Sequence, residues 1–290
     1  MKNPEAFANS SGDPPPADSS KTRRRDRERT SSPKSKETLD VLFDGKLSLF
    51  QSGTGYRFSL DALLLASFVT VKRRDRVIDL GTGNGVIPLA LADYYPSITV
   101  TGVEIQPAMA QRARKNLHLN RLNNRIKIVM GDVRSIDAIL EAASCEVVVS
   151  NPPYRKPGSG RVSPNDEKRI ARHETQGDLG DFLRAGAFLL RAKGRMAMVY
   201  SAGRCIDLLS AMRQTRIEPK RMRMVHSFAE VEASLVLVEG VKGGRSGVEV
   251  LAPLTIYRRG KEYSEEVAAM IAGTRRGTVQ SSRLKAKDLS

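Results

Sequence analysis

Residues 76–94 read RVIDLGTGNGVIPLALADY, and this stretch decides the fold. Apart from Arg76 and Asp79, the run 76–80 is apolar and partly β-branched, which predicts a buried strand. Three of the next five residues, 81–85, are glycines, and a helix-like segment, 86–94, follows without a gap. Glycines allow a ligand to approach the backbone closely, and the start of a helix offers free N–H groups to an anion. We therefore predict a strand, a ligand-binding loop and a helix, in that order.

The alternation of strands and helices continues along the chain. Further β-branched or apolar runs lie at 98–104, 125–130, 146–150, 194–200, 218–226, 233–239 and 248–254. Helix-like segments separate the first five strands and lie at 86–94, 107–120, 135–143 and 178–190. Apolar strands that alternate with helices indicate a parallel sheet covered on both faces. The last strands follow one another without a clear helix, so we expect the sheet to end in an antiparallel hairpin. The pattern predicts a doubly wound, Rossmann-like α/β domain whose ligand lies at the carboxyl ends of the strands.

The chain carries a formal net charge of +16 over its 290 residues. Lysine and arginine release counterions when they neutralise phosphates, so this charge favours a polyanionic partner such as RNA. Basic tails also occur on proteins that bind no nucleic acid, and charge alone leaves that alternative open. The two cysteines, Cys145 and Cys205, lie far apart without metal-ligand spacing, so we expect neither a disulfide framework nor a metal site.

The sequence also bears on where the protein works. The first 20 residues are polar and rich in proline, unlike a signal peptide. The longest apolar stretch, near residues 62–71, is too short to cross a bilayer. We therefore expect no membrane contact and a cytoplasmic location.

The spacing of the glycines separates two classes of nucleotide-binding site. A dinucleotide-binding loop reads G-x-G-x-x-G, and Val86 stands where its third glycine belongs. The G-x-G-x-G order of residues 81–85 instead resembles the first motif of class I S-adenosylmethionine-dependent methyltransferases. That resemblance implies that the loop backs the methionine part of the cofactor and that Asp79 reaches its amino group. The loop residues assigned to this site are Gly81, Thr82, Gly83 and Gly85.

Two acidic residues follow the next strands of the predicted sheet. Glu104 ends the second strand, and its carboxylate suits two ribose hydroxyls because it accepts two hydrogen bonds side by side. NAD-dependent enzymes share such an acid, so Glu104 alone does not separate the two classes. Asp132 follows the third strand and is placed to accept from an adenine amino group; alternatively it caps a helix that begins near Ser135. Ile105 and Val133, which follow these acids, are assigned to the same site.

The fourth strand runs into Asn151-Pro152-Pro153-Tyr154, at the same expected sheet edge as the glycine loop. Asn-Pro and Pro-Pro also form simple turns after strands, which is the alternative reading. The chemistry favours catalysis, because the lone pair of an amide or nucleobase amino nitrogen is delocalised and must be oriented. The Asn151 side-chain oxygen and the Pro152 carbonyl can each accept one amino hydrogen, and the successive prolines hold these acceptors in place. Tyr154 can stack on a flat substrate.

These motifs together resemble the bacterial tRNA1(Val) adenine-37 N6-methyltransferase family over about residues 38–257. The resemblance also rests on residues 51–62, QSGTGYRFSLDA. It implies a class I methyltransferase that uses S-adenosylmethionine to form N6-methyladenosine in a tRNA anticodon loop. It further implies that Tyr56, Phe58 and Asp61 border the site, although Asp61 could serve only as a first-turn acid of the following helix.

A polar loop follows the catalytic motif. Its segment 171–174, ARHE, also matches relatives in this family. Arg172 is a candidate contact to substrate phosphate, whereas His173 fits a structural role better. Loops that carry such residues suit substrate entry.

Composition, the alternation of elements and the resemblance together divide the chain into four parts. We expect a disordered basic tail at 1–36 and a strand and helix segment flanking the cofactor site at 37–71. The methyltransferase domain is expected at 72–260, and a C-terminal helix with a basic tail at 261–290.

Other functions share parts of this pattern. Asn-Pro-Pro-Tyr also occurs in glutamine N5-methyltransferases that act on release factors, but these carry a helical N-terminal domain, for which 37–71 is too short. Guanine-N2 and cytosine-N4 RNA methyltransferases have related tetrapeptides and stay as alternatives. The intact glycine loop with Asn151 and Tyr154 argues against a noncatalytic RNA-binding module. Val86, in place of the third glycine of a dinucleotide-binding loop, argues against a dehydrogenase.

Overall fold

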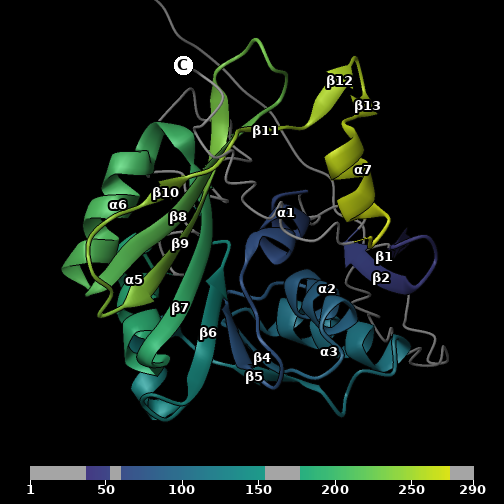
Figure 1. Ribbon diagram of the computed structural model, residues 1–290. Coiled ribbons are helices and arrows are strands. Elements are labelled where there is room, and N and C mark those ends of the chain that lie inside the picture. The colour runs from purple at the N-terminus through teal and green to yellow at the C-terminus, as the bar shows by residue number, and fades with distance from the viewer. Residues whose placement is uncertain (1–36, 53–59, 154–176, 275–290) are drawn as a thin grey trace, which may run out of the picture. The chain divides into compact units, whose positions relative to one another are not determined.

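The computed structural model describes residues 37–52, 60–153 and 177–274 (Figure 1). Its central sheet has the strand order β10-β8-β9-β7-β6-β3-β4-β5, and β11 also pairs with β8. The strands of this sheet are β3 (Arg76–Leu80), β4 (Thr99–Glu104), β5 (Ile126–Met130), β6 (Cys145–Ser150), β7 (Leu190–Ser201), β8 (Ile217–His226), β9 (Ala233–Lys242), β10 (Glu249–Val250) and β11 (Leu254–Thr255). Two small sheets pair β1 (Glu37–Leu42) with β2 (Leu47–Ser52) and β12 (Tyr257–Arg259) with β13 (Glu262–Tyr263). The helices are α1 (Leu60–Phe68), α2 (Val86–Tyr94), α3 (Pro107–Leu119), α5 (Leu179–Leu189), α6 (Cys205–Gln214) and α7 (Glu265–Ile271), with short 3-10 helices η1 (Val133–Ala138) and η2 (Ala202–Arg204).

The central sheet is parallel over most of its width. Strands β5, β4, β3, β6 and β7 pair in parallel. Strand β9 is antiparallel to both β7 and β8, so β8 again runs in the same direction as β7. The carboxyl ends of β3, β4, β6, β7 and β8 therefore lie at one edge of the sheet. The predicted antiparallel hairpin at the end of the sheet is confirmed.

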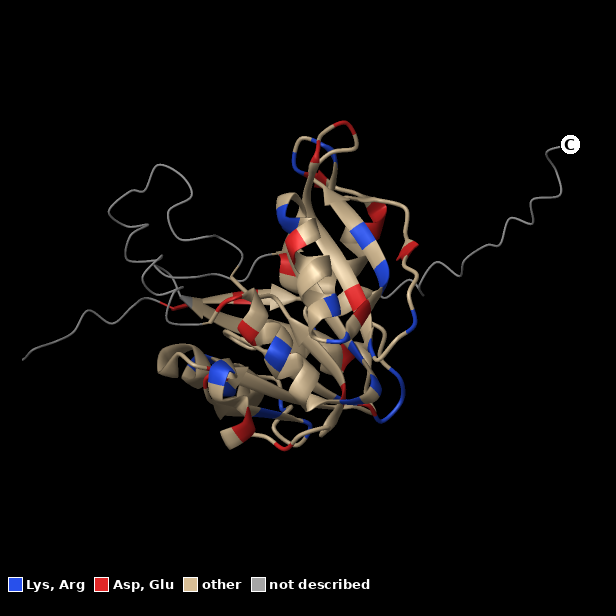
Figure 2. Cartoon of the chain, turned by 90° about the vertical axis from the view of Figure 1, so that its left-hand side faces the viewer, with Lys and Arg blue, Asp and Glu red and all other residues tan. Residues whose placement is uncertain are grey.

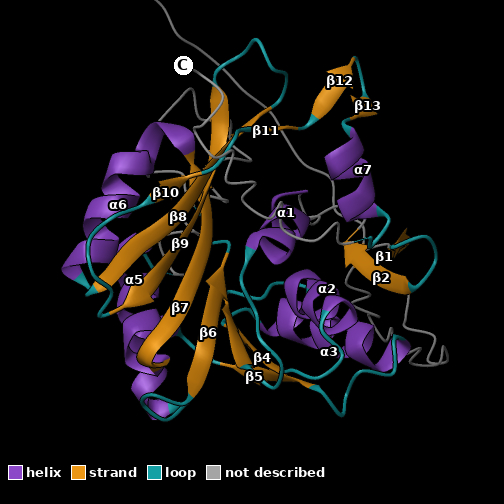
Figure 3. Ribbon diagram, in the orientation of Figure 1, coloured by secondary structure: helices purple, strands orange, loops and turns teal. Residues whose placement is uncertain are grey.

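Helices cover both faces of the sheet (Figure 3). Helices α1, α2 and α3 contribute to one core, and α5 and α6 to the other. Successive side chains of β3 alternate between the two cores, with Val77 in the first and Ile78 in the second. This alternation is what a strand buried on both sides requires, because consecutive side chains point to opposite faces. The predicted doubly wound α/β fold is confirmed.

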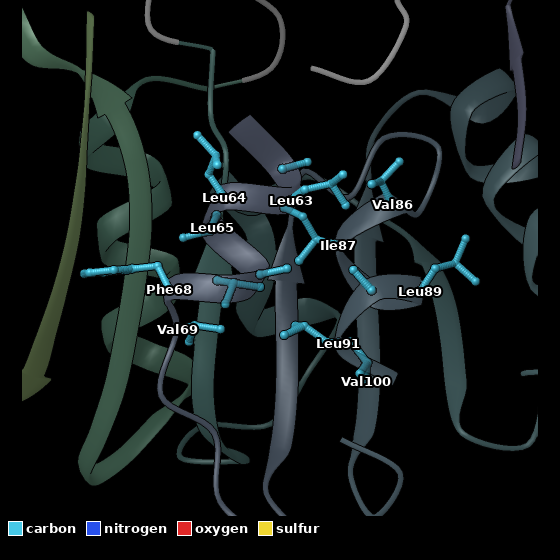
Figure 4. Packing of buried hydrophobic residues seen from close by; sticks show 14 of the residues in the cluster. Leu63, Leu64, Leu65, Phe68, Val69, Val86, Ile87, Leu89, Leu91 and Val100 are labelled. Atoms are coloured by element: carbon cyan, nitrogen blue, oxygen red, sulfur yellow. The ribbon is translucent and has the colours of Figure 1, made fainter. Parts of the chain in front are cut away.

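Two short helices are apolar on every side and are buried accordingly. Leu63, Leu64 and Leu65 of α1 are at most 1% exposed, and every residue of 86–92 in α2 is buried (Figure 4). A helix without a polar face belongs inside a protein rather than on its surface. Burying each leucine side chain stabilises the fold by about 1.5–3 kcal/mol. The buried α2 fixes the position of the loop that precedes it.

The hairpin β1–β2 is held by the C-terminal part of the chain. Phe43 lies in the turn of this hairpin and is fully buried. The centroid of its ring is 5.1 Å from that of the Tyr94 ring. The backbone N–H of Phe43 donates to the carbonyl of Ile271 in α7 at 3.1 Å. A Cβ on Gly273 would come within 2.7 Å of the Phe43 ring, so only glycine fits beside it. The first and last described segments thus support each other.

Three sequence-based expectations were wrong in detail. A helix, α6, lies between β7 and β8, where none was expected; its buried residues, Cys205, Leu208 and Met212, form a single narrow stripe. The helix expected at 135–143 is the 3-10 helix η1, which is interrupted at Ser135 by non-helical dihedral angles. The strand expected at 248–254 is two short strands, β10 and β11, that pair separately with β8.

The described ranges also bear on membranes, metals and thiols. Within them, no helix combines the length and apolarity that crossing a bilayer would require. Nor do these residues bring together three or more His, Cys, Asp or Glu side chains in a way that could hold a metal. Cys145 and Cys205 are buried free thiols, and burial raises the pKa of Cys145 to about 12.

Candidate functional site

Three segments far apart in the sequence meet at the carboxyl edge of the sheet. The register pairs Leu80 with the residue before Glu104 on β4 and with the residue before Asn151 on β6. Gly81, Glu104 and Asn151 therefore follow at the same level on three adjacent parallel strands. The Ser150 hydroxyl donates to the Leu80 carbonyl at 2.9 Å and joins the ends of β6 and β3. The structure thus brings the glycine loop, the acid after β4 and the Asn-Pro motif together, as predicted.

The loop between β3 and α2 has a backbone that requires glycine. Gly81, Gly83 and Gly85 have φ angles of 75°, 58° and 86°. This left-handed region costs other residues roughly 1–2 kcal/mol each. Gly85 also precedes the first turn of α2, and no side chain caps that turn. The N–H groups at the start of α2 are therefore available to an anion such as a carboxylate.

Asp79 has one engaged and one unpaired carboxyl oxygen. The side chain is fully buried, and the Thr82 hydroxyl donates to Oδ2 at 2.6 Å. Oδ1 is buried and accepts no hydrogen bond from any residue that the structure describes. Burial raises the pKa of Asp79 to about 7; the Thr82 hydrogen bond opposes this shift, and the nearby Glu104 carboxylate adds to it. A cation placed at Oδ1 would compensate the buried charge.

Glu104 is 4% exposed and supports the glycine loop. Its Oε2 accepts the backbone N–H of Gly83 at 2.8 Å, and its Oε1 accepts that of Gln106 at 2.8 Å. Burial raises the pKa of Glu104, while the hydrogen bonds from Gln106 and Gly83 act in the opposite direction. Each carboxylate oxygen has a second lone pair, so both can still accept a ligand hydroxyl.

Gly102, within β4, makes room for Thr82 and was not found from the sequence. A Cβ on Gly102 would come within 2.8 Å of both Oγ1 and Cγ2 of Thr82. Glycine at this position therefore lets Thr82 hold Asp79. A lone glycine in an apolar run was the only sequence signal, and it equally suits a strand irregularity.

Asp132 caps a helix in this structure, which is the alternative that the sequence left open. Its carboxylate accepts the backbone N–H of Arg134 at 2.9 Å and precedes η1 as its N-cap. The Arg134 guanidinium also binds it through Nε and Nη2, which lowers the pKa of Asp132. Val133 starts η1 and is buried, and Ile105, after β4, is half-buried. The contact of Asp132 with an adenine amino group stays a prediction.

The predicted catalytic motif, residues 151–154, is only partly described. Asn151 is half-buried, Pro152 is buried, and Pro153 is half-buried. No hydrogen bond or ion pair joins the Asn151 side chain to another residue in the described ranges. Tyr154 and Arg172 lie outside these ranges, as do Tyr56, Phe58 and His173. Asp61 lies in the first turn of α1.

A buried asparagine of α3 was also missed. Asn116 has no exposed surface, and its Nδ2 donates to the Asn84 carbonyl in the glycine loop at 2.9 Å. The same side chain hydrogen-bonds to the backbone of Phe50 in β2. Asn116 and Asn120 are four residues apart and so share a helix face, which was the available sequence signal.

These groups match the polar parts of S-adenosylmethionine, the cofactor that the resemblance implies. The unpaired Asp79 oxygen suits an ammonium group, and the uncapped start of α2 suits a carboxylate. Glu104 suits the two ribose hydroxyls. The residues present therefore fit this cofactor.

Comparison with known proteins connects this site with methyl transfer. The sequence model of the methyltransferase small domain family matches residues 58–214 of this chain. A tRNA1(Val) (adenine(37)-N6)-methyltransferase of Porphyromonas gingivalis is 29% identical over 206 residues, covering 69% of this chain and 80% of that protein. One of the same name from Parabacteroides distasonis is 26% identical, covering 78% and 93% of the two chains.

A solved structure extends the similarity to the fold. The crystal structure of a protein from Agrobacterium tumefaciens, described as a predicted O-methyltransferase, is 25% identical with a TM-score of 0.62. The match covers 74% of this chain and 96% of that one.

Proposed function

Because the chain belongs to the methyltransferase small domain family, we propose that it forms N6-methyladenosine in the anticodon loop of a tRNA. The enzyme is a methyltransferase that uses S-adenosylmethionine. One observation carries the choice of an amino nitrogen as acceptor: Asn151 and Pro152 lie beside Gly81, at the end of the neighbouring strand. The names of the relatives from two bacteria support adenine as the base.

The cofactor-binding part of the proposal assigns one task to each polar group. Asp79 binds the ammonium of the methionine part, and the first turn of α2 binds its carboxylate. Glu104 accepts the ribose hydroxyls, and Asp132 accepts from the adenine amino group while Arg134 keeps it ionised. S-adenosylmethionine supplies a methyl group on a positively charged sulfur.

The acceptor part of the proposal rests on orientation. The Asn151 side-chain oxygen and the Pro152 carbonyl each accept one hydrogen of the substrate amino group and direct its lone pair toward the methyl group. Pro153 restricts the backbone that presents these acceptors, and Tyr154 stacks on the base. None of these groups is a strong base, so the extra proton on the methylated nitrogen leaves to water after the transfer, and S-adenosylhomocysteine is the other product. The contribution of these groups is positioning, which can lower a barrier by several kcal/mol.

The distribution of charge supports an RNA substrate. The β12–β13 hairpin follows β11, which pairs with Val225 and His226 at the carboxyl end of β8. This hairpin therefore lies at the edge of the sheet that carries the site (Figure 1). Arg259 and Lys261 are exposed there, and neither side chain forms an ion pair or hydrogen bond with a described residue.

At least one other face of the molecule is less suited to a polyanion. On the face that Figure 2 shows, basic and acidic residues are interspersed. Glu262 also lies in the β12–β13 hairpin and partly offsets the positive charge of Arg259 and Lys261. We infer that the hairpin contributes some of the phosphate contacts, and that the cytoplasm, where tRNA is modified, is the site of action.

The experiment is methyl transfer from tritiated S-adenosylmethionine onto total tRNA from a strain that lacks this modification. Digestion to nucleosides and mass spectrometry should place the label in N6-methyladenosine. Label in a modified guanosine or cytidine would still show an RNA methyltransferase but would contradict adenine as the methylated base. Label in release-factor protein, with none in RNA, would favour a glutamine N5-methyltransferase.

A further inference from the structure

Asn116 joins the β1–β2 hairpin to the glycine loop of the proposed cofactor site. Its Oδ1 accepts the backbone N–H of Phe50 at 2.7 Å, and its Nδ2 donates to the Phe50 carbonyl at 3.2 Å. The same Nδ2 donates to the carbonyl of Asn84, inside the glycine loop, at 2.9 Å. The side chain has no exposed surface, so these hydrogen bonds do not compete with water.

Asn120, one helical turn later, makes the same kind of contact with the hairpin but not with the loop. Its Oδ1 accepts the N–H of Ser48 at 2.9 Å, and its Nδ2 donates to the Ser48 carbonyl at 2.7 Å. The side-chain amides of Asn116 and Asn120 pair with backbone N–H and C=O groups of β2, as a neighbouring strand would do along its outer edge. Asn116 and Asn120 therefore dock β2 on α3, where Arg112 and Lys115 also pair with Glu37 of β1. Of the two asparagines, only Asn116 also binds the loop.

The loop is held at two consecutive residues from two sides. Glu104 accepts the N–H of Gly83, and Asn116 donates to the carbonyl of Asn84. Asn84 is 3% exposed, and its Nδ2 lacks a hydrogen-bond partner among the described residues. The loop therefore keeps its shape through its backbone contacts, and removal of one of them leaves a buried carbonyl unpaired.

We propose that Asn116 is a positioning residue for the methyl donor, because its one buried amide couples docking of the β1–β2 hairpin to the ligand-ready shape of the glycine loop. Through Asn116, a ligand that fixes the loop also stabilises the hairpin, and the hairpin in turn favours the binding shape of the loop. This coupling is reciprocal by thermodynamic necessity. It rests on the proposed cofactor site and not on the identity of the RNA.

The test compares Asn116→Ala with Asn120→Ala by titration calorimetry of S-adenosylhomocysteine. Both variants lose two hydrogen bonds to β2, and Asn116→Ala also leaves the buried Asn84 carbonyl unpaired, so its melting temperature should fall at least as far as that of Asn120→Ala. Asn116→Ala should bind the ligand about tenfold or more weakly, whereas Asn120→Ala should stay within about threefold of the wild type. Equal weakening in both variants would overturn the proposal, because the hairpin alone would then explain the effect.

Hydrogen exchange on the wild-type protein tests the coupling without any substitution. Adding S-adenosylhomocysteine should slow exchange in a peptide covering residues 47–52 as well as in one covering the glycine loop. In Asn120→Ala both effects should persist, and in Asn116→Ala the effect on 47–52 should disappear. Protection of the loop with none in 47–52 of the wild type would contradict the coupling. Absence of any binding by the wild type would instead count against the cofactor site, and neither result depends on whether tRNA is the substrate.

Discussion

The Thr82 hydroxyl donates to one oxygen of the Asp79 carboxylate at 2.6 Å, and the other oxygen of that carboxylate is buried without a partner among the described residues. A buried acid held in this way is unfavourable in the free protein and favourable once a cation binds it. The raised pKa of Asp79, about 7, expresses the same imbalance. Several measurable consequences depend on this carboxylate and its neighbours.

The affinity for S-adenosylmethionine should fall as the pH falls. The ammonium of the ligand binds the ionised form of Asp79, whose pKa in the free protein is about 7. Below that pH the protein must lose a proton before it binds, so the affinity at pH 6 should be about tenfold lower than at pH 8. The pKa of Glu104 is also raised by burial, and its protonation acts in the same direction. Calorimetry in buffers of different ionisation enthalpy should detect proton release near pH 7, and an affinity independent of pH would contradict the role of Asp79.

Asp79→Asn should stabilise the ligand-free protein while abolishing tight binding of the methyl donor. The pKa of Asp79 is raised from 3.8 to about 7 in the folded state, so the folded protein loses stability as the pH rises from about 4 to about 7, and the loss is complete above 7. A neutral amide avoids that cost and can still accept from Thr82. The melting temperature should rise by roughly 2–8 °C at pH 8 and by less at pH 6, since 1 kcal/mol corresponds to about 2–4 °C for a domain of this size. An unchanged or lower melting temperature at pH 8 would show that the buried carboxylate is not a source of strain.

Gly102→Ala should weaken ligand binding through Thr82. The added Cβ would lie 2.8 Å from the Thr82 side chain and push it away from Asp79. We expect about a tenfold loss in affinity for S-adenosylhomocysteine, in line with the loss of one hydrogen bond to a charged group. Gly203→Ala is a matched control, because a Cβ there meets nothing within 4 Å. Wild-type affinity in Gly102→Ala would show that the position of Thr82 is not important.

Replacing Arg259 and Lys261 by alanine should weaken tRNA binding and flatten its dependence on salt. Each phosphate contact contributes about 0.7–0.9 to the slope of log affinity against log salt, so two contacts predict a change of about 1.4–1.8. Alanines at Lys72 and Arg73 are the control, because these exposed cations precede β3 and so lie at the opposite edge of the sheet. Affinity for S-adenosylhomocysteine should not change in either double variant. Equal salt slopes in the two double variants would show that the β12–β13 hairpin does not contact the RNA phosphates.

The sequence predicted the structure best in the segment 76–94, where the apolar pattern and the glycines both indicate the same arrangement. The strand 76–80 and the helix 86–94 were predicted to the residue, since an apolar strand, three glycines and an apolar helix leave one arrangement for the chain. Asp79, Glu104 and Asn151 were assigned to one sheet edge from their places after strands, and the structure brings them there. Parallel strands make this inference general, because their carboxyl ends share an edge.

Features that depend on contacts between distant segments could not be predicted in this way. Helix α6 buries only Cys205, Leu208 and Met212, and this narrow apolar stripe lies between the two strands β7 and β8, so the segment was not predicted as a helix. The functions of Gly102 and Asn116 depend on neighbours, Thr82 and Asn84, that are distant in the sequence. For Asp132 the sequence offered two roles, and its pairing with Arg134 became visible only in the structure.

The central claim is that Asn151, beside the glycine loop, orients the adenine amino group for methyl transfer. It is tested most directly by the rate of N6-methyladenosine formation in a single turnover, measured for the wild type and Asn151→Ala with saturating S-adenosylmethionine and tRNA. Loss of a positioned acceptor should slow the reaction about a hundredfold or more, while the affinity for S-adenosylhomocysteine changes less than about twofold. A variant that forms N6-methyladenosine at the wild-type rate would contradict the account.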